Sequence, residues 1–354
     1  MSSVSGLVKG LHHISLVTAD QEKNRRFYTE VLGLRRVKLT VNQDDPYHRH
    51  LFYADEKGTT GTAITFFEWP DLPRGQVGLG SPHHLSYTVK GVDALPPWAA
   101  WLRANGVKVA GPFERGERVS LYLRDPDGVM VEITSKNPEG VGLDYLRRLE
   151  AGEQTGLTSE MRLVKFDHAS PLSSDSSVMR KFIQTFVGLE SFSEGANPDQ
   201  EGTSLAEAGS REDPGFMKYL VAPGAWTGTV GRGNIHHIAV SVEEDEDQLR
   251  IKRRLDEGGI RNSGVVDRFW FKSLYFRDPD YNLLEVATRK PGYAVDEPSE
   301  RLGTSLVLPS WLEGSRPRIE AALRETDARS HGAWPPEYEP VPSPPESIPA
   351  GARR

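Results

Sequence analysis

The sequence has no cysteine among its 354 residues. This absence excludes disulfide bonds, thiolate metal ligands and a cysteine nucleophile, and it suits a reducing cytosol. The sequence also lacks any run of about 18 apolar residues, and its N-terminus lacks the basic-then-apolar order of a signal peptide. We therefore expect a cytoplasmic protein with no membrane span. No basic stripe stands out against the net charge of −7, so nucleic acid is not an expected partner.

The sequence does contain a strong internal repeat. Residues 121–135 (LYLRDPDGVMVEITS) nearly match residues 274–288 (LYFRDPDYNLLEVAT). The same offset places the His236-His237 doublet on His83-His84. Two similar openings occur at Leu11-His12-His13-Ile14 and Phe166-Asp167-His168-Ala169. The chain therefore contains four related units.

Each unit is predicted to run strand, helix and three strands, from its alternation of apolar residues and its turn residues. The predicted fold class is α+β, with four βαβββ units that form two domains with cupped mixed sheets. We place the first pair of units at residues 8–140, the second pair at residues 158–308, and a proline-rich tail at residues 309–354. One short helix is expected at 316–324. The tail after Trp334 is expected to lie extended on the surface.

Glu285 is the first candidate for chemistry. It lies inside an apolar strand, where a carboxylate is costly to bury unless a partner compensates its charge. His237 lies in the first strand of the same unit, and a metal cation would satisfy both side chains. Two imidazoles and one carboxylate leave open positions on non-haem Fe(II) for substrate and O₂. A third ligand would come from another unit, as either His13 or His168.

The layout of four units, the histidine doublets and the Arg-Asp-Pro-Asp…Leu-Glu endings resemble the vicinal oxygen chelate superfamily. Over residues 8–308 the chain most resembles its hydroquinone ring-cleaving dioxygenase branch, through the doublets at 12–13 and 236–237, the Arg268…Tyr275 spacing and Leu284-Glu285. The resemblance implies that the first and fourth units share a barrel. It also implies Fe(II), or alternatively Mn(II), bound by His13, His237 and Glu285. The substrate pocket would contain His12, His236, Arg268 and Tyr275.

The expected activity is Fe(II)-dependent cleavage of a hydroquinone or catechol-type ring, with a small aromatic diol and O₂ as partners. His236 or Tyr275 would act as the acid–base group, and Arg268 would hold an anionic oxygen. We also expect a homo-oligomer. Two alternatives remain. If Glu68 were a fourth ligand, the site would resemble a glyoxalase I-like lyase. Without a metal, the protein would resemble a drug-sequestering binding protein of the bleomycin-resistance type. Three ligands are favoured, because Trp69-Pro70 directly after Glu68 predicts the end of the strand.

A second set of residues nearly copies the first. It consists of His84, Glu132 and His168, with Arg115 and Tyr122 in the places of Arg268 and Tyr275. The favoured interpretation is a vestige of duplication that now forms core, and the alternative is a second metal ion. Three further histidines, His48, His50 and His331, are interpreted as ordinary core or surface residues.

Overall fold

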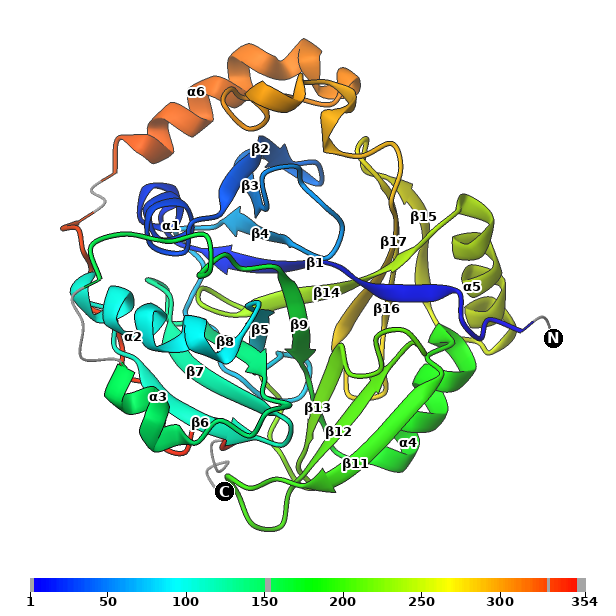
Figure 1. Cartoon of the computed structure of the whole chain (residues 1–354). Helices are drawn as coiled ribbons and strands as arrows, with labels where there is room; N and C mark the ends of the chain where they lie inside the picture. The colour runs from blue at the N-terminus through cyan, green and yellow to red at the C-terminus, as the bar shows by residue number, and fades with distance from the viewer. Residues whose placement is uncertain (1–2, 150–153, 330–331, 349–354) are drawn as a thin grey trace.

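The structure is a computed structural model that describes residues 3–149, 154–329 and 332–348. Its strands form two large sheets in the middle of the molecule, and the helices lie around them (Figure 1). Each unit has one strand, a helix and three further strands in that order, with a two-residue strand added in the third unit. The predicted α+β class with four βαβββ units is therefore confirmed. Among the described helices, none has the length and apolar content needed to cross a membrane.

The first and fourth units together make one eight-stranded sheet. The first unit contains β1 (Val8–Thr18), α1 (Gln21–Arg26), β2 (Arg35–Asn42), β3 (Asp45–Ala54) and β4 (Ala63–Glu68). The fourth contains β14 (Ile235–Val242), α5 (Asp245–Glu257), β15 (Asn262–Asp267), β16 (Lys272–Arg277) and β17 (Leu283–Thr288). The strand order is β15-β16-β17-β14-β1-β4-β3-β2, so β1 and β14 join the two units at the centre.

The second and third units make the other sheet in the same way. The second unit contains β5 (His84–Thr88), α2 (Leu95–Ala104), β6 (Ala110–Arg115), β7 (Arg118–Arg124) and β8 (Met130–Lys136). The third contains β9 (Lys165–Ser170), β10 (Leu172–Ser173), α4 (Ser176–Phe182), β11 (Ser191–Ala196), β12 (Ser204–Gly209) and β13 (Met217–Val221). The order is β11-β12-β13-β9-β5-β8-β7-β6, with β10 beside β13. Each sheet therefore takes one unit from each half of the chain. The predicted ranges 8–140 and 158–308 each contribute one unit to each sheet.

Local sequence explains where the helices of the first and third units begin. Asp20 accepts hydrogen bonds from the backbone N–H groups of Glu22 and Lys23, which caps α1. Asp175 caps α4 in the same way. Both helices continue into a π-helical turn, at Phe27–Val31 and Ile183–Val187, and Gly188 ends the second in a left-handed conformation at φ 80°. Carboxylates at these positions satisfy N–H groups that would otherwise have no partner.

The C-terminal segment does not lie extended on the surface as expected. The predicted helix at 316–324 is present as α6 (Arg316–Asp327), and its Ile319 and Leu323 pack on Val41. Beyond it, Tyr338, Glu346 and Ile348 are buried at 2%, 0% and 5% exposure. The segment after Trp334 therefore packs into the molecule at several points rather than lying on its surface. Apolar burial drives the contacts of Tyr338 and Ile348, whereas Glu346 needs polar partners.

Candidate metal centre

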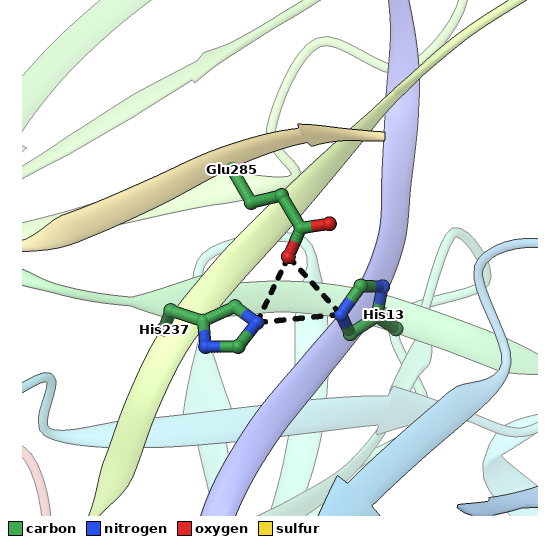
Figure 2. Close-up of side chains that lie close together, drawn as sticks. All are labelled: His13, His237 and Glu285. Atoms are coloured by element: carbon green, nitrogen blue, oxygen red, sulfur yellow. Dashed lines mark hydrogen bonds and ion pairs between the residues drawn. The ribbon is translucent and has the colours of Figure 1, made fainter. Parts of the chain in front are cut away.

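Three donor atoms from three strands meet inside the eight-stranded sheet: His13 on β1, His237 on β14 and Glu285 on β17 (Figure 2). Glu285 Oε2 lies 2.9 Å from His237 Nε2 and 3.3 Å from His13 Nε2. The two Nε2 atoms are 3.4 Å apart. Strand register produces this meeting, because Ala239 of β14 pairs with both Glu285 and His13. Of the two histidines considered for the third place, the structure brings His13 to this cluster, whereas His168 lies in the other sheet.

The geometry and the hydrogen bonds of this cluster fit a metal ion. Two donor atoms each about 2.1 Å from one ion, at an angle of about 90–110°, lie about 3.0–3.4 Å apart, close to the three separations found here. Glu285 Oε1 accepts a hydrogen bond from Ser273 Oγ at 2.5 Å, and the buried Oε2 faces the Nε2 atoms of His13 and His237. A buried carboxylate oxygen that faces two imidazole nitrogens is the arrangement that a divalent cation would complete.

Charge states in the cluster also favour metal binding. Burial alone would raise the pKa of Glu285, but the imidazoles of His13 and His237 hold that pKa well below its usual range. Burial lowers the pKa of His237, with the Glu285 carboxylate opposing the shift in part. The site thus favours an ionised carboxylate beside a neutral imidazole, the forms that bind metal ions.

His12 and His236 lie behind the ligand histidines. His12 Nδ1 is 2.8 Å from His13 Nδ1, and His236 Nδ1 is 2.8 Å from His237 Nδ1, so one nitrogen of each pair donates to the other. Burial lowers the pKa of His12 and of His236 to about 3. Neither ring lines the pocket over the cluster, which differs from the substrate-pocket position expected for them. The register between β1 and β14 is irregular at His12 and at His236, and each of these rings contacts the ligand histidine that follows it. The second histidine of each doublet therefore reaches the site and the first one orients it.

Arg268 and Tyr275 do line this pocket, as expected. The two terminal guanidinium nitrogens of Arg268, Nη1 and Nη2, donate to the carboxylate of Asp44 at 3.0 and 2.8 Å. The guanidinium carbon lies 5.4 Å from the centre of the Tyr275 ring. Burial raises the pKa of Tyr275, so its hydroxyl keeps its proton at neutral pH. The pocket therefore offers a fixed cation and a phenolic proton close to the cluster.

The rest of the pocket wall is mostly aromatic. Sequence reasoning did not single out these side chains, which are Phe52, Phe67, Trp270 and Phe271. They come from β3, β4 and the connection between β15 and β16, and no repeat or motif marks them. Flat apolar walls of this kind suit a flat apolar ring. A larger surface cleft lies elsewhere, around Leu34, Trp98 and Leu163, away from the three donor atoms.

His50 is a further pocket residue that sequence reasoning placed among ordinary histidines. Its ring lies between Phe52 and Phe67, with ring centres 4.2 Å away on each side. Its Nε2 is 2.9 Å from Thr65 Oγ1, which is 2.7 Å from Ser15 Oγ. These contacts fix the ring in the pocket wall. The signal available in the sequence was weak, because a lone histidine on a strand is usually structural. His331 lies outside the described residues.

Glu68 does not belong to the cluster. Its carboxylate binds Arg49 Nη1 at 2.8 Å and accepts the backbone N–H of Gln21 at 3.2 Å. In the fourth unit, the residue two places after His237 is Ala239, and it pairs with Glu285. In the first unit, the residue two places after His13 is Ser15, and it pairs with Thr65. Thr65, not Glu68, therefore stands at the position that corresponds to Glu285. Glu68 is three residues further on, roughly 10 Å along the strand and on the opposite face. The cluster therefore has three protein donors.

Comparisons with known proteins identify the family of the chain. The family model described as Glyoxalase/Bleomycin resistance protein/Dioxygenase superfamily matches residues 10–133 and 180–286. MhqA of Bacillus subtilis (strain 168), provisionally described as a ring-cleaving dioxygenase, is 33% identical over 324 residues, covering 90% of this chain and 98% of its own. The chlorohydroquinone/hydroquinone 1,2-dioxygenase of Sphingobium indicum is 27% identical and covers 90% of this chain and 97% of its own. A crystal structure of a Bacillus subtilis protein, provisionally described as a dioxygenase, superposes with a TM-score of 0.75 at 32% identity, covering 90% and 97% of the two chains.

Paired βαβββ units around a buried His–His–Glu cluster define a class of proteins that can hold a metal ion inside a curled sheet. The chain belongs to the Glyoxalase/Bleomycin resistance protein/Dioxygenase superfamily.

Proposed function

We propose that this chain is an Fe(II)-dependent dioxygenase that cleaves the ring of a hydroquinone or catechol-type diol. The observation that carries the proposal is the three-donor cluster, with the neutral Thr65 at the register position where a fourth carboxylate would stand. A three-donor site leaves room for a substrate oxygen and O₂ together. Relatives named as ring-cleaving dioxygenases support the same reaction class.

His13, His237 and Glu285 would hold the metal ion, with Mn(II) as a second candidate. When bound, Fe(II) would supply a site for the diol oxygen and for O₂ and a route for electrons between them. His12 and His236 would keep the ligand rings in one tautomer and orientation through their Nδ1 contacts. Ser273 holds the other oxygen of Glu285, so the oxygen that faces the histidines stays in place.

Arg268 and Tyr275 would act on the substrate itself. Arg268 is held by Asp44 and would bind an anionic oxygen of the diol or of the opened product. Tyr275 would give and take a proton at a substrate oxygen. Of the two residues considered for acid–base work, Tyr275 is favoured because it lines the pocket, whereas His236 lies behind His237.

The aromatic walls would hold the ring flat and exclude water. His50, fixed between Phe52 and Phe67, adds one polar group to this wall. Burial holds its pKa well below the usual range, so it stays neutral and can donate or accept at a substrate hydroxyl. The second hydroxyl oxygen of a diol would need a hydrogen-bond partner of this kind in an apolar pocket.

The two alternatives fit less well. A glyoxalase-type lyase would use a fourth carboxylate, but the position offers Thr65 and Glu68 faces away. A metal-free binding protein would leave Glu285 Oε2 buried beside two imidazoles without a role.

The test is anaerobic loading with Fe(II), followed by oxygen uptake on a panel of hydroquinones and catechols. The proposal predicts uptake with at least one diol and none with the Zn(II)-loaded protein. Zn(II)-supported turnover of a glutathione hemithioacetal, with no oxygen uptake on any diol, would favour the lyase instead.

A further inference from the structure

The second sheet contains a complete copy of the three-donor cluster. Glu132 Oε2 lies 3.1 Å from His168 Nε2 and 3.5 Å from His84 Nε2, and the two nitrogens are 3.4 Å apart. We call these three residues the second triad. Arg115 and Tyr122 stand beside it as Arg268 and Tyr275 stand beside the first, with Arg115 Nε 3.0 Å from the Tyr122 hydroxyl. Asp199 binds Arg115 at 2.8 Å, as Asp44 binds Arg268.

Lys218 is the first difference between the two sites. In the other three units, the residue paired two positions after the strand histidine is Thr65, Glu132 or Glu285. In the third unit Ala169 pairs with Met217, so the next position places Lys218 beside Ser170, two residues after His168. Strand register therefore directs a lysine to the place from which two other units project a carboxylate. Its side chain is buried, at 5% exposure.

Glu346 of the C-terminal segment is the second difference. Its carboxylate is fully buried, and Oε1 accepts hydrogen bonds from the Tyr122 hydroxyl at 2.6 Å and from Lys218 Nζ at 2.8 Å. The same oxygen lies 3.7 Å from Arg115 Nε and 3.8 Å from His84 Nε2. A carboxylate from the tail therefore occupies the space over the second triad that remains open as the pocket over the first.

Hydrogen bonds to backbone groups also hold the segment that contains Glu346. Asp199 accepts the N–H of Glu346 at 2.8 Å, and Asn197 Nδ2 donates to its carbonyl at 3.1 Å. The side chain of Gln200 bonds both the N–H and the carbonyl of Ile348, at 2.7 and 3.3 Å. Ile348 packs in an apolar cluster with Leu172 and Leu220. These contacts define one position for the segment 346–348 rather than a loose surface contact.

Charge balance explains why the two differences occur together. A buried ammonium is costly unless an anion pairs with it, and a buried carboxylate is costly without a cation. Lys218 and Glu346 satisfy each other at 2.8 Å. A divalent cation held by the second triad would lie close to the Lys218 ammonium in a low-dielectric interior, where two positive charges repel strongly. Thr65 at the corresponding position of the first site brings no such charge.

We propose that the second site is a carboxylate-binding site whose ligand is the chain's own Glu346, with Lys218 supplying the positive charge that a metal ion supplies in the first. The site latches the C-terminal segment onto the second sheet, and the second triad binds no metal. The inference does not depend on which reaction the first site performs.

Hydrogen exchange followed by mass spectrometry tests the latch in the full-length protein. Glu346→Ala and Lys218→Met should each speed exchange of the backbone amides of Glu346, Ser347 and Ile348 by about tenfold or more, because both remove the ion pair that holds the segment. The control is Glu337→Ala, an exposed position in the same segment, which should leave exchange unchanged. Unchanged exchange in Glu346→Ala, with wild-type circular dichroism, would overturn the latch.

Acetate tests whether the site recognises a carboxylate. Added acetate should raise the Tm of Glu346→Ala, relative to an equal concentration of chloride, and should not raise that of the Glu346→Ala/Lys218→Met double variant. An equal response of both variants would overturn the assignment of Lys218 as the binding cation. Metal analysis completes the test: Glu132→Gln should keep the wild-type metal content, and loss of an equivalent in that variant would show that the second triad binds a metal ion after all.

Discussion

Thr65 and Glu285 occupy the same register position in the first and fourth units, each paired with the strand residue two places after a ligand histidine. The third unit has Lys218 there and the second has Glu132. We infer that this one position in the repeat helps to set what each site binds. Opposite Glu285 this position holds the neutral Thr65, and opposite Glu132 it holds Lys218, whose ammonium binds Glu346.

The first prediction concerns the donors. Glu285→Gln and His237→Ala should each lower metal affinity by roughly 10- to 100-fold or more, because loss of one of three protein donors leaves too little to hold a labile divalent ion. Metal content after gel filtration, measured by inductively coupled plasma mass spectrometry, checks this. Full iron content in both variants would contradict the assignment of Glu285 and His237 as metal ligands.

The second prediction builds the missing fourth donor. Thr65→Glu should tighten metal binding and slow oxygen uptake by roughly tenfold or more, because a fourth protein ligand takes a position that O₂ or substrate needs. The matched control is Glu68→Gln, which faces Arg49 and should leave metal affinity unchanged. Equal metal affinity in Thr65→Glu and the wild type would argue that this position does not face the ion.

The third prediction separates binding from proton transfer in the pocket. Tyr275→Phe should lower kcat by roughly 10²- to 10⁴-fold with little change in KM, since it removes only the phenolic proton. Arg268→Met should mainly raise KM, because it removes the cation that holds an anionic oxygen. Steady-state oxygen uptake under Fe(II) saturation distinguishes the two. A Tyr275→Phe enzyme of normal kcat would exclude Tyr275 as the acid–base group.

The fourth prediction concerns pH and the second triad. Burial alone would lower the pKa of His168, but Glu132 and Asp167 raise it to about 9. A folded-state pKa above the ordinary value of about 6.5 means stabilisation that is complete below about pH 6.5 and is lost as pH rises through about 9. Urea unfolding at these pH values should show a smaller loss of unfolding free energy in His168→Gln than in the wild type. Parallel losses in both proteins would contradict the charged imidazole.

Much of the fold followed from the sequence because it is repeated. Four similar strand openings, three with a histidine doublet and one with Asp167-His168, mark the four units, and Arg-Asp-Pro-Asp turns precede the last strand of two of them. The pairing of units across the two halves came from family resemblance, since strand periodicity does not say which sheets join. His13, His237 and Glu285 meet as the resemblance implied, and their metal-binding role remains a prediction.

Other features had no such signal. Glu68 looked similar to Glu285 by its place near a strand end, but a difference of three residues in register turns it to the other face. No other unit has a histidine at the position of His50, so the repeat did not mark it. Glu346 lies in a proline-rich stretch whose composition suggested an exposed strap, and only the three-dimensional contact with Lys218 explains its burial. Local sequence patterns do not predict which single residues come into contact when they are far apart in the chain.

The central claim is a three-donor iron centre that uses O₂, and oxygen uptake by the anaerobically Fe(II)-loaded protein tests it most directly. With a hydroquinone or catechol, the wild type should consume about one O₂ per diol as the ring absorbance is lost, while the Zn(II)-loaded protein and Glu285→Gln should consume none. Absence of oxygen uptake by fully iron-loaded protein across the diol panel would contradict the account.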